Sequence, residues 1–67
     1  MAVPTDPVLR NWAAYVKAVT DTRMPLDVWV PVLEPLAMDS EFRGQTENEQ
    51  RFEVDSWIAR NGAILNR

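Results

Sequence analysis

The chain of 67 residues contains no cysteine and no histidine. The absence of cysteine excludes disulfide bonds and thiol chemistry, and the absence of histidine removes a main zinc ligand and the commonest general base. So small a domain has limited core to stabilise it, which favours association with a partner or a second copy. We therefore expect no catalytic residues, no metal and no cofactor, no small-molecule substrate, and a protein that is not an enzyme.

Long apolar runs are also missing. Glu34 and two prolines interrupt the one stretch that approaches a membrane span, so no membrane segment is expected. The first residues lack the basic region and apolar core of a signal peptide. These features predict a cytoplasmic protein that forms a single helical domain over residues 1–67.

The net charge of −3 is unevenly distributed along the chain. Residues 27–55 carry eight acidic residues against two arginines, a net charge of −6, whereas residues 1–26 and 56–67 are net positive. An acidic middle disfavours nucleic acid as a partner. It favours attraction toward a basic protein or toward the basic end of a second copy.

The densest apolar segment runs from Pro25 to Met38. Its apolar residues recur at helical spacing, but Pro31 and Pro35 lack the N–H group that a helix interior uses. Both prolines fall opposite the apolar stripe, so we predict a central helix that is kinked or broken at Pro31 and Pro35. An extended segment is the alternative, because β-branched residues precede proline, although no other alternating run could pair with it.

A second helix is predicted near the N-terminus. Asp6 or Thr5 can accept hydrogen bonds from the first N–H groups of a helix, and Pro7 fits its first position. The apolar residues between Val8 and Val19 then form one stripe along this helix. Residues 20–23 lose this pattern and are expected to form a short connection.

A third helix is predicted from about residue 46 to residue 61. Thr46 and Glu49 have the spacing of a capping box. Residues 39–45, which precede them, are predicted to form a polar loop that turns at Gly44. Gly62 is placed to end the helix in a left-handed conformation, unless the helix continues through it. The predicted fold class is therefore all-α, a small three-helix domain.

Some apolar residues fall outside the three predicted stripes. Phe52 lies about 180° around its helix from the stripe, with Ala59 seven residues later on the same side. Phe52 could fold under the preceding loop beside Phe42, or it could belong to a surface that another chain covers. The predicted protein-binding surface has an acidic rim and comprises Val28, Trp29, Val32, Glu41, Phe42, Glu49, Phe52 and Ala59.

Two acidic patterns fail as chemical sites. Acids and a glycine between Asp39 and Glu47 partly match a calcium loop, but Arg43 would put a cation among the ligands and Gln50 replaces the bidentate glutamate. Glu49 and Glu53 are neighbours on one helix, but the sequence indicates no pocket, cation or apolar surround that would perturb their ionisation, so we expect them to form a solvated helix face.

The sequence thus favours a non-enzymatic module that binds another protein or a second copy of itself. Its size, its mild acidity and its lack of cysteine and histidine are compatible with a small viral or mobile-element protein that inhibits host machinery. The alternative is a helix-turn-helix regulator that reads DNA with the segment from Gln45 to Arg51, whose residue types suit base edges. Glu47 and Glu49 in that segment oppose contact with phosphates.

Overall fold

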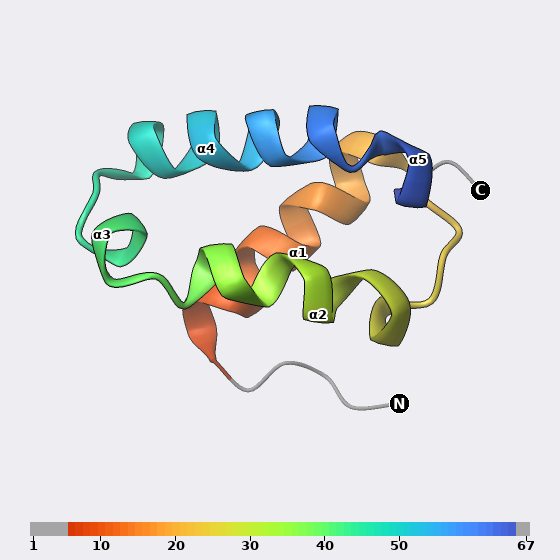
Figure 1. The fold of residues 1–67 in the computed structure, drawn as a ribbon, viewed down its shortest axis with the longest axis horizontal. Helices are drawn as coiled ribbons and strands as arrows, with labels where there is room; N and C mark the ends of the chain where they lie inside the picture. The colour runs from red at the N-terminus through yellow and green to blue at the C-terminus, as the bar shows by residue number, and fades with distance from the viewer. Residues whose placement is uncertain (1–5, 66–67) are drawn as a thin grey trace.

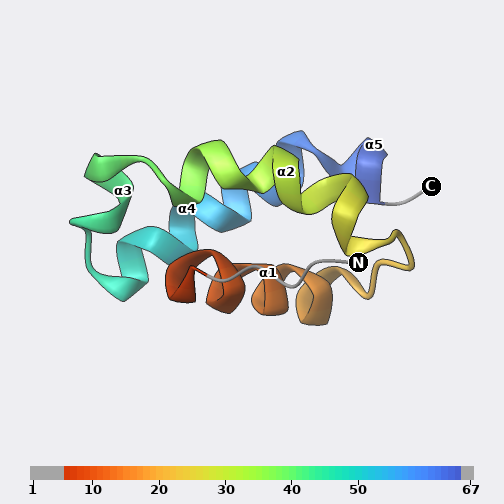
Figure 2. The same ribbon diagram turned by 90° about the horizontal axis from the view of Figure 1, so that it is seen from below.

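The computed structural model describes residues 6–65, which form five helices and no strand. The helices are α1 (Pro7–Thr20), α2 (Leu26–Ala37), α3 (Ser40–Arg43), α4 (Glu47–Arg60) and α5 (Gly62–Leu65). α2 and α4 run in opposite directions along the long axis, and α1 crosses behind α2 (Figures 1 and 2). The all-α prediction is confirmed, with two short helices added to the three expected.

α1 begins as the sequence predicts. The Asp6 carboxylate accepts a hydrogen bond from the Leu9 N–H at 2.9 Å, and Pro7 takes the first helical position. The helix ends at Thr20, and the residue that caps it, Asp21, has a φ of 52°, which lies in the left-handed region that usually favours glycine. No local sequence pattern predicted this conformation at an aspartate.

α2 continues as one helix through Pro31 and Pro35. Both prolines are exposed, so the carbonyls of Asp27 and Pro31, which lack their usual N–H partner, lie on the side that faces water. The helix prediction is confirmed, whereas the break and the extended alternative are wrong. A kink at either proline stays a prediction.

Residues 39–45 are not the polar loop that was expected, because they contain α3. The Asp39 carboxylate accepts from the Phe42 N–H at 3.3 Å, and this single turn buries the Phe42 ring. Arg43 follows and donates from both of its terminal nitrogens to the Asp6 carboxylate, at 3.0 and 3.1 Å. Gly44 ends the turn in an ordinary right-handed conformation.

α4 begins with the predicted capping box. The Thr46 hydroxyl accepts from the Glu49 N–H at 3.3 Å, and the Glu49 carboxylate accepts from the Thr46 N–H at 3.0 Å. The left-handed ending predicted for Gly62 is wrong, because Gly62 instead opens α5. The Thr22 hydroxyl donates to the Leu65 carbonyl at 2.7 Å and so ties α5 to the α1–α2 connection.

The core is built around aromatic side chains. Trp12 meets Phe42 edge-on at a centroid distance of 6.4 Å, and Trp29 lies 6.5 Å from Trp57. These contacts join α1 to α3 and α2 to α4. The other buried apolar residues are Leu9, Ala13, Val16, Val30, Leu33, Ala37, Val54 and Leu65.

Among residues 6–65, no helix combines the length and the apolar character that crossing a membrane requires.

Candidate protein-binding surface

α2 is apolar on nearly all of its sides. Asp27 and Glu34 are the only charged residues among its 12. Val28 and Val32 lie one turn apart on the same side of α2, and they expose 45% and 39% of their surface. A helix that is apolar all round is normally buried, so the outer face of α2 presents apolar area that the described chain does not cover.

Phe52 is the most exposed large apolar residue of the described chain, at 72%. It lies on the side of α4 away from the buried Val54 and Trp57, and Ala59 shares this exposed side. Phe42, by contrast, is 1% exposed. The alternative in which Phe52 folds under the loop beside Phe42 is therefore wrong.

Val32 of α2 and Glu53 of α4 lie near the sides on which these two helices face each other. The contact between Trp29 and Trp57 marks the sides on which these helices face each other. Val32 follows Trp29 by three residues and Glu53 precedes Trp57 by four, so helical spacing places both near those facing sides. We use the term exposed apolar surface for Val28, Val32 and Phe52 together.

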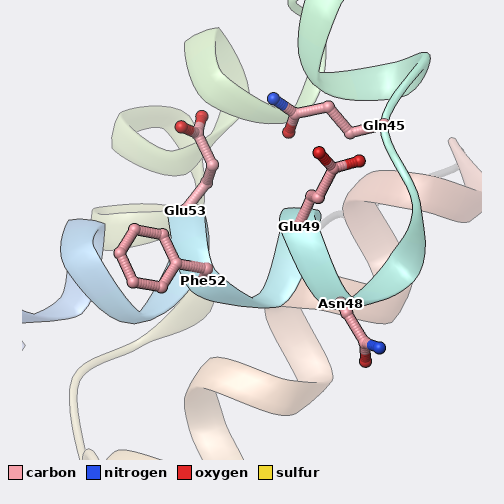
Figure 3. A pocket seen from close by; sticks show the side chains of 5 residues that line it. All are labelled: Gln45, Asn48, Glu49, Phe52 and Glu53. Atoms are coloured by element: carbon pink, nitrogen blue, oxygen red, sulfur yellow. The ribbon is translucent and has the colours of Figure 1, made fainter.

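An open pocket of about 330 Å³ lies beside Phe52 in the first half of α4. Its lining residues are Gln45, Asn48, Glu49, Phe52 and Glu53. Figure 3 shows the Gln45 amide and the Glu49 and Glu53 carboxylates directed toward one another, whereas the Asn48 side chain points away. The pocket thus combines one aromatic ring with several hydrogen-bond acceptors.

One acceptor of the pocket is held in place by hydrogen bonds, and another has no donor in the part of the chain that the structure describes. Oε1 of Glu49 accepts from the backbone N–H and the hydroxyl of Thr46, and these hydrogen bonds lower the pKa of Glu49. Oε1 of Gln45 is buried and has no hydrogen-bond partner within the described residues. The one ion pair between described residues joins Arg43 to Asp6, so neither pocket glutamate is neutralised by a cation there.

Gln50 positions the wall of the pocket, a role that was not predicted from the sequence. Its Nε2 donates to the Phe42 carbonyl at 2.9 Å and to the Gln45 carbonyl at 3.3 Å, while its Oε1 accepts from the Trp12 indole N–H at 3.0 Å. The signal was available, because Gln50 shares the buried stripe of α4 with Val54. A polar residue on such a stripe needs partners.

The structure divides the predicted interface residues into two groups. Trp29 and Phe42 are buried, so their expected place on the surface is wrong; both rings fill the core of a small domain instead. The exposed group comprises Val28, Val32, Glu41, Glu49, Phe52 and Ala59.

The residues of the partial calcium pattern have other roles in the fold. Asp39 caps α3, and Arg43 forms the ion pair with Asp6. Across residues 6–65 there is no group of three or more acidic residues arranged to hold a metal ion.

The segment that would read DNA is only partly presented to solvent. Thr46, Asn48 and Arg51 are exposed, but Gln45 is half-buried, and the exposed acids Glu47 and Glu49 lie among them. The helix-turn-helix alternative stays a prediction that this charge arrangement disfavours.

Comparison with protein-family models, with curated proteins and with solved structures finds no match to this chain.

Proposed function

We propose that this chain is a non-enzymatic protein-binding module, an adaptor or inhibitor whose exposed apolar surface contacts another protein or a second copy of itself. The observation that carries the proposal is the outer face of α2. Val28 and Val32 are exposed there beside two exposed prolines, on a helix with only two charged residues. Burying that face against a partner would remove apolar area from water.

The exposed apolar surface has the composition of a binding site. Phe52 is an aromatic side chain that projects 72% exposed from α4, and large rings of this kind often anchor an interface when a partner encloses them. The valines of α2 would add apolar contact. On binding they would lose less rotamer freedom than long side chains lose. Together they support contact with a protein rather than with a small polar ligand.

Acidic residues beside this surface favour a basic partner. Glu49 and Glu53 line the pocket next to Phe52, and Glu41 is exposed on α3. Charges at the rim of an interface mainly raise the association rate and discriminate between partners. Complex formation should therefore weaken as salt is raised, because salt screens exposed charges.

The proposal is tested by affinity capture from lysate of the cells that produce the protein. The immobilised wild type is compared with the double variant Val28→Gln, Val32→Gln, and the retained proteins are quantified by mass spectrometry. Both positions are exposed, so each substitution should change stability by no more than about 0.5 kcal/mol. We expect the double variant to lose the proteins that the wild type retains.

Ala18→Gln serves as the matched control, because Ala18 is exposed on α1. This variant should retain the same proteins as the wild type. Equal retention by the wild type and the double valine variant would contradict the proposal. Sedimentation of the purified protein tests self-association separately: a concentration-dependent dimer that the valine substitutions abolish would identify the partner as a second copy.

The DNA-binding alternative is tested with nonspecific duplex DNA at several salt concentrations. Electrostatic binding is strongest at low salt. Retardation at low salt that Arg51→Gln reduces would favour the alternative, and no retardation at any salt concentration would remove it.

A further inference from the structure

We propose that the pocket beside Phe52 receives an arginine side chain of the partner protein. The inference rests on the proposed function and specifies the chemistry of what is bound. It starts from the convergence of Gln45, Glu49 and Glu53 on one open pocket (Figure 3).

The pocket presents acceptors to its occupant. Glu49 and Glu53 supply carboxylates, and the buried Oε1 of Gln45 has no hydrogen-bond partner within the described residues. A buried acceptor is normally paired, so this oxygen marks the place of a missing donor. A ligand with several N–H groups and a positive charge would meet the two carboxylates directly, and it would reach the buried Gln45 oxygen once that amide turns toward the pocket.

Phe52 selects among the cations that could enter. Its ring lines the pocket and is largely exposed, so a flat cation can lie against its face. A guanidinium group is planar, carries five N–H donors and stacks on aromatic rings, whereas an ammonium group is a compact, strongly hydrated charge. Arginine therefore fits this combination of a ring and divergent acceptors better than lysine does.

The Glu49 carboxylate is already held in one orientation before such a ligand binds. Its Oε1 is held by two hydrogen bonds from Thr46, at 3.0 and 3.1 Å, which fix the direction of the group. The acidic charge of residues 27–55 would also draw a basic segment toward the pocket. Pre-orientation of this kind reduces the entropy that binding costs.

The test is a titration of the whole chain with N-acetyl-arginine methylamide, followed by amide chemical shifts. We expect shifts confined to the Gln45 side-chain amide and to backbone amides near residues 48–53. The neutral isostere N-acetyl-citrulline methylamide should produce no such shifts, and N-acetyl-lysine methylamide should bind more weakly. No shifts at these positions, or equal shifts with citrulline, would overturn the inference.

Variants then assign the binding to the pocket. Glu53→Gln and Phe52→Leu should each weaken arginine binding by about threefold to tenfold, as expected for one exposed charge contact or one cation–π contact. Asp27→Asn removes an exposed acid outside the pocket and should leave the affinity unchanged. Unchanged affinity in Glu53→Gln would contradict the assignment, and shifts outside the pocket report whether each variant keeps its fold.

Failure of this inference is distinguishable from failure of the proposed function. If the valine double variant loses its partner while the arginine compound binds nowhere, the pocket assignment fails and the protein-binding function stands. If the arginine compound binds the pocket but no variant changes what the protein captures, the pocket assignment stands and the protein-binding function fails.

Discussion

Gln50 does more for the fold than its polar character suggests. Its side chain links the buried Trp12 of α1, Phe42 of α3 and the loop at Gln45 to α4. Removal of a partner from a buried donor leaves that donor unsatisfied, which costs more than the hydrogen bond itself contributes. The single side chain therefore joins α4 to α1, 38 residues away in sequence, and to the neighbouring α3 and loop.

Gln50→Leu should destabilise the protein by about 1–3 kcal/mol, because the Trp12 indole N–H loses its acceptor inside the core. The measurement is urea unfolding, in which the midpoint should fall while the slope stays unchanged. Asn48→Ala, at an exposed position of the same helix, is the control and should behave like the wild type. A Gln50→Leu midpoint equal to the control would contradict the role assigned to Gln50.

The carboxylates that begin α1 and α4 make stability depend on pH. Hydrogen bonds from the Arg43 guanidinium and then the Leu9 N–H lower the pKa of Asp6, and hydrogen bonds from Thr46 lower the pKa of Glu49. Their contribution is complete above the ordinary values of 3.8 and 4.5, and it is lost as pH falls through the lower folded values. Acid should therefore destabilise the fold in that range.

Thermal unfolding from neutral to strongly acidic pH checks this expectation. Glu49→Gln keeps one acceptor oxygen but has no charge to lose, so its unfolding midpoint should depend less steeply on acid pH than that of the wild type. Glu47→Gln removes an acid from the same turn that takes no part in the capping box, and it should keep the wild-type dependence. Identical slopes in all three proteins would refute the assignment.

Interactions between residues close in sequence could be predicted, whereas interactions between residues far apart in sequence could not. The caps at Asp6 and Thr46 follow from three-residue spacing, because a cap bonds only its own helix. The pair between Arg43 and Asp6 joins positions 37 apart, so no local pattern reveals it. The left-handed Asp21 was missed for a related reason, because its conformation is set by where the chain must turn after α1.

α2 is the helix whose sequence and conformation disagree most. Pro31 and Pro35 each remove one backbone hydrogen bond, yet the helix continues for 12 residues. The buried side of α2 explains this, since Trp29, Val30, Leu33 and Ala37 all pack in the core. Burial of these side chains offsets the cost of two prolines that lie on the exposed side.

Pro31→Ala should stabilise the protein, because it restores an N–H for the Asp27 carbonyl in an exposed helix interior. The gain is about 1–3 kcal/mol after allowance for the more flexible unfolded chain. Urea unfolding measures it, with Pro25→Ala as the control, since Pro25 precedes the helix and should show no comparable gain. A loss of stability in Pro31→Ala would contradict a continuous helix through this position.

The long helices were predicted because each carries a periodic apolar stripe, whereas α3 was not. A single turn is too short to show periodicity, and Asp39 and Phe42 were the only marks of a cap and a buried ring. The prediction for the end of α4 was also wrong. Gly62 suggested a left-handed stop, but burial of Leu65 is achieved by a further right-handed turn.

Across the whole molecule, the sequence separates core from surface only in part. It identified Val28, Val32 and Phe52 as outside the stripes, and all three are exposed. It placed Trp29 and Phe42 with them, but both rings are needed to close the core across α2–α4 and α1–α3. Facing helices decide which large side chains are covered, and one helix considered alone cannot show this.

The absence of cysteine allows the exposed apolar surface to be probed at one position at a time. Val32→Cys and Phe52→Cys can each be labelled with a benzophenone maleimide, and Ala14→Cys, exposed on α1, provides the control. After irradiation in lysate of the producing cells, the central claim predicts one common crosslinked protein, or a crosslinked dimer, from positions 32 and 52 and not from position 14. The same products from all three positions, or none from positions 32 and 52, would contradict it.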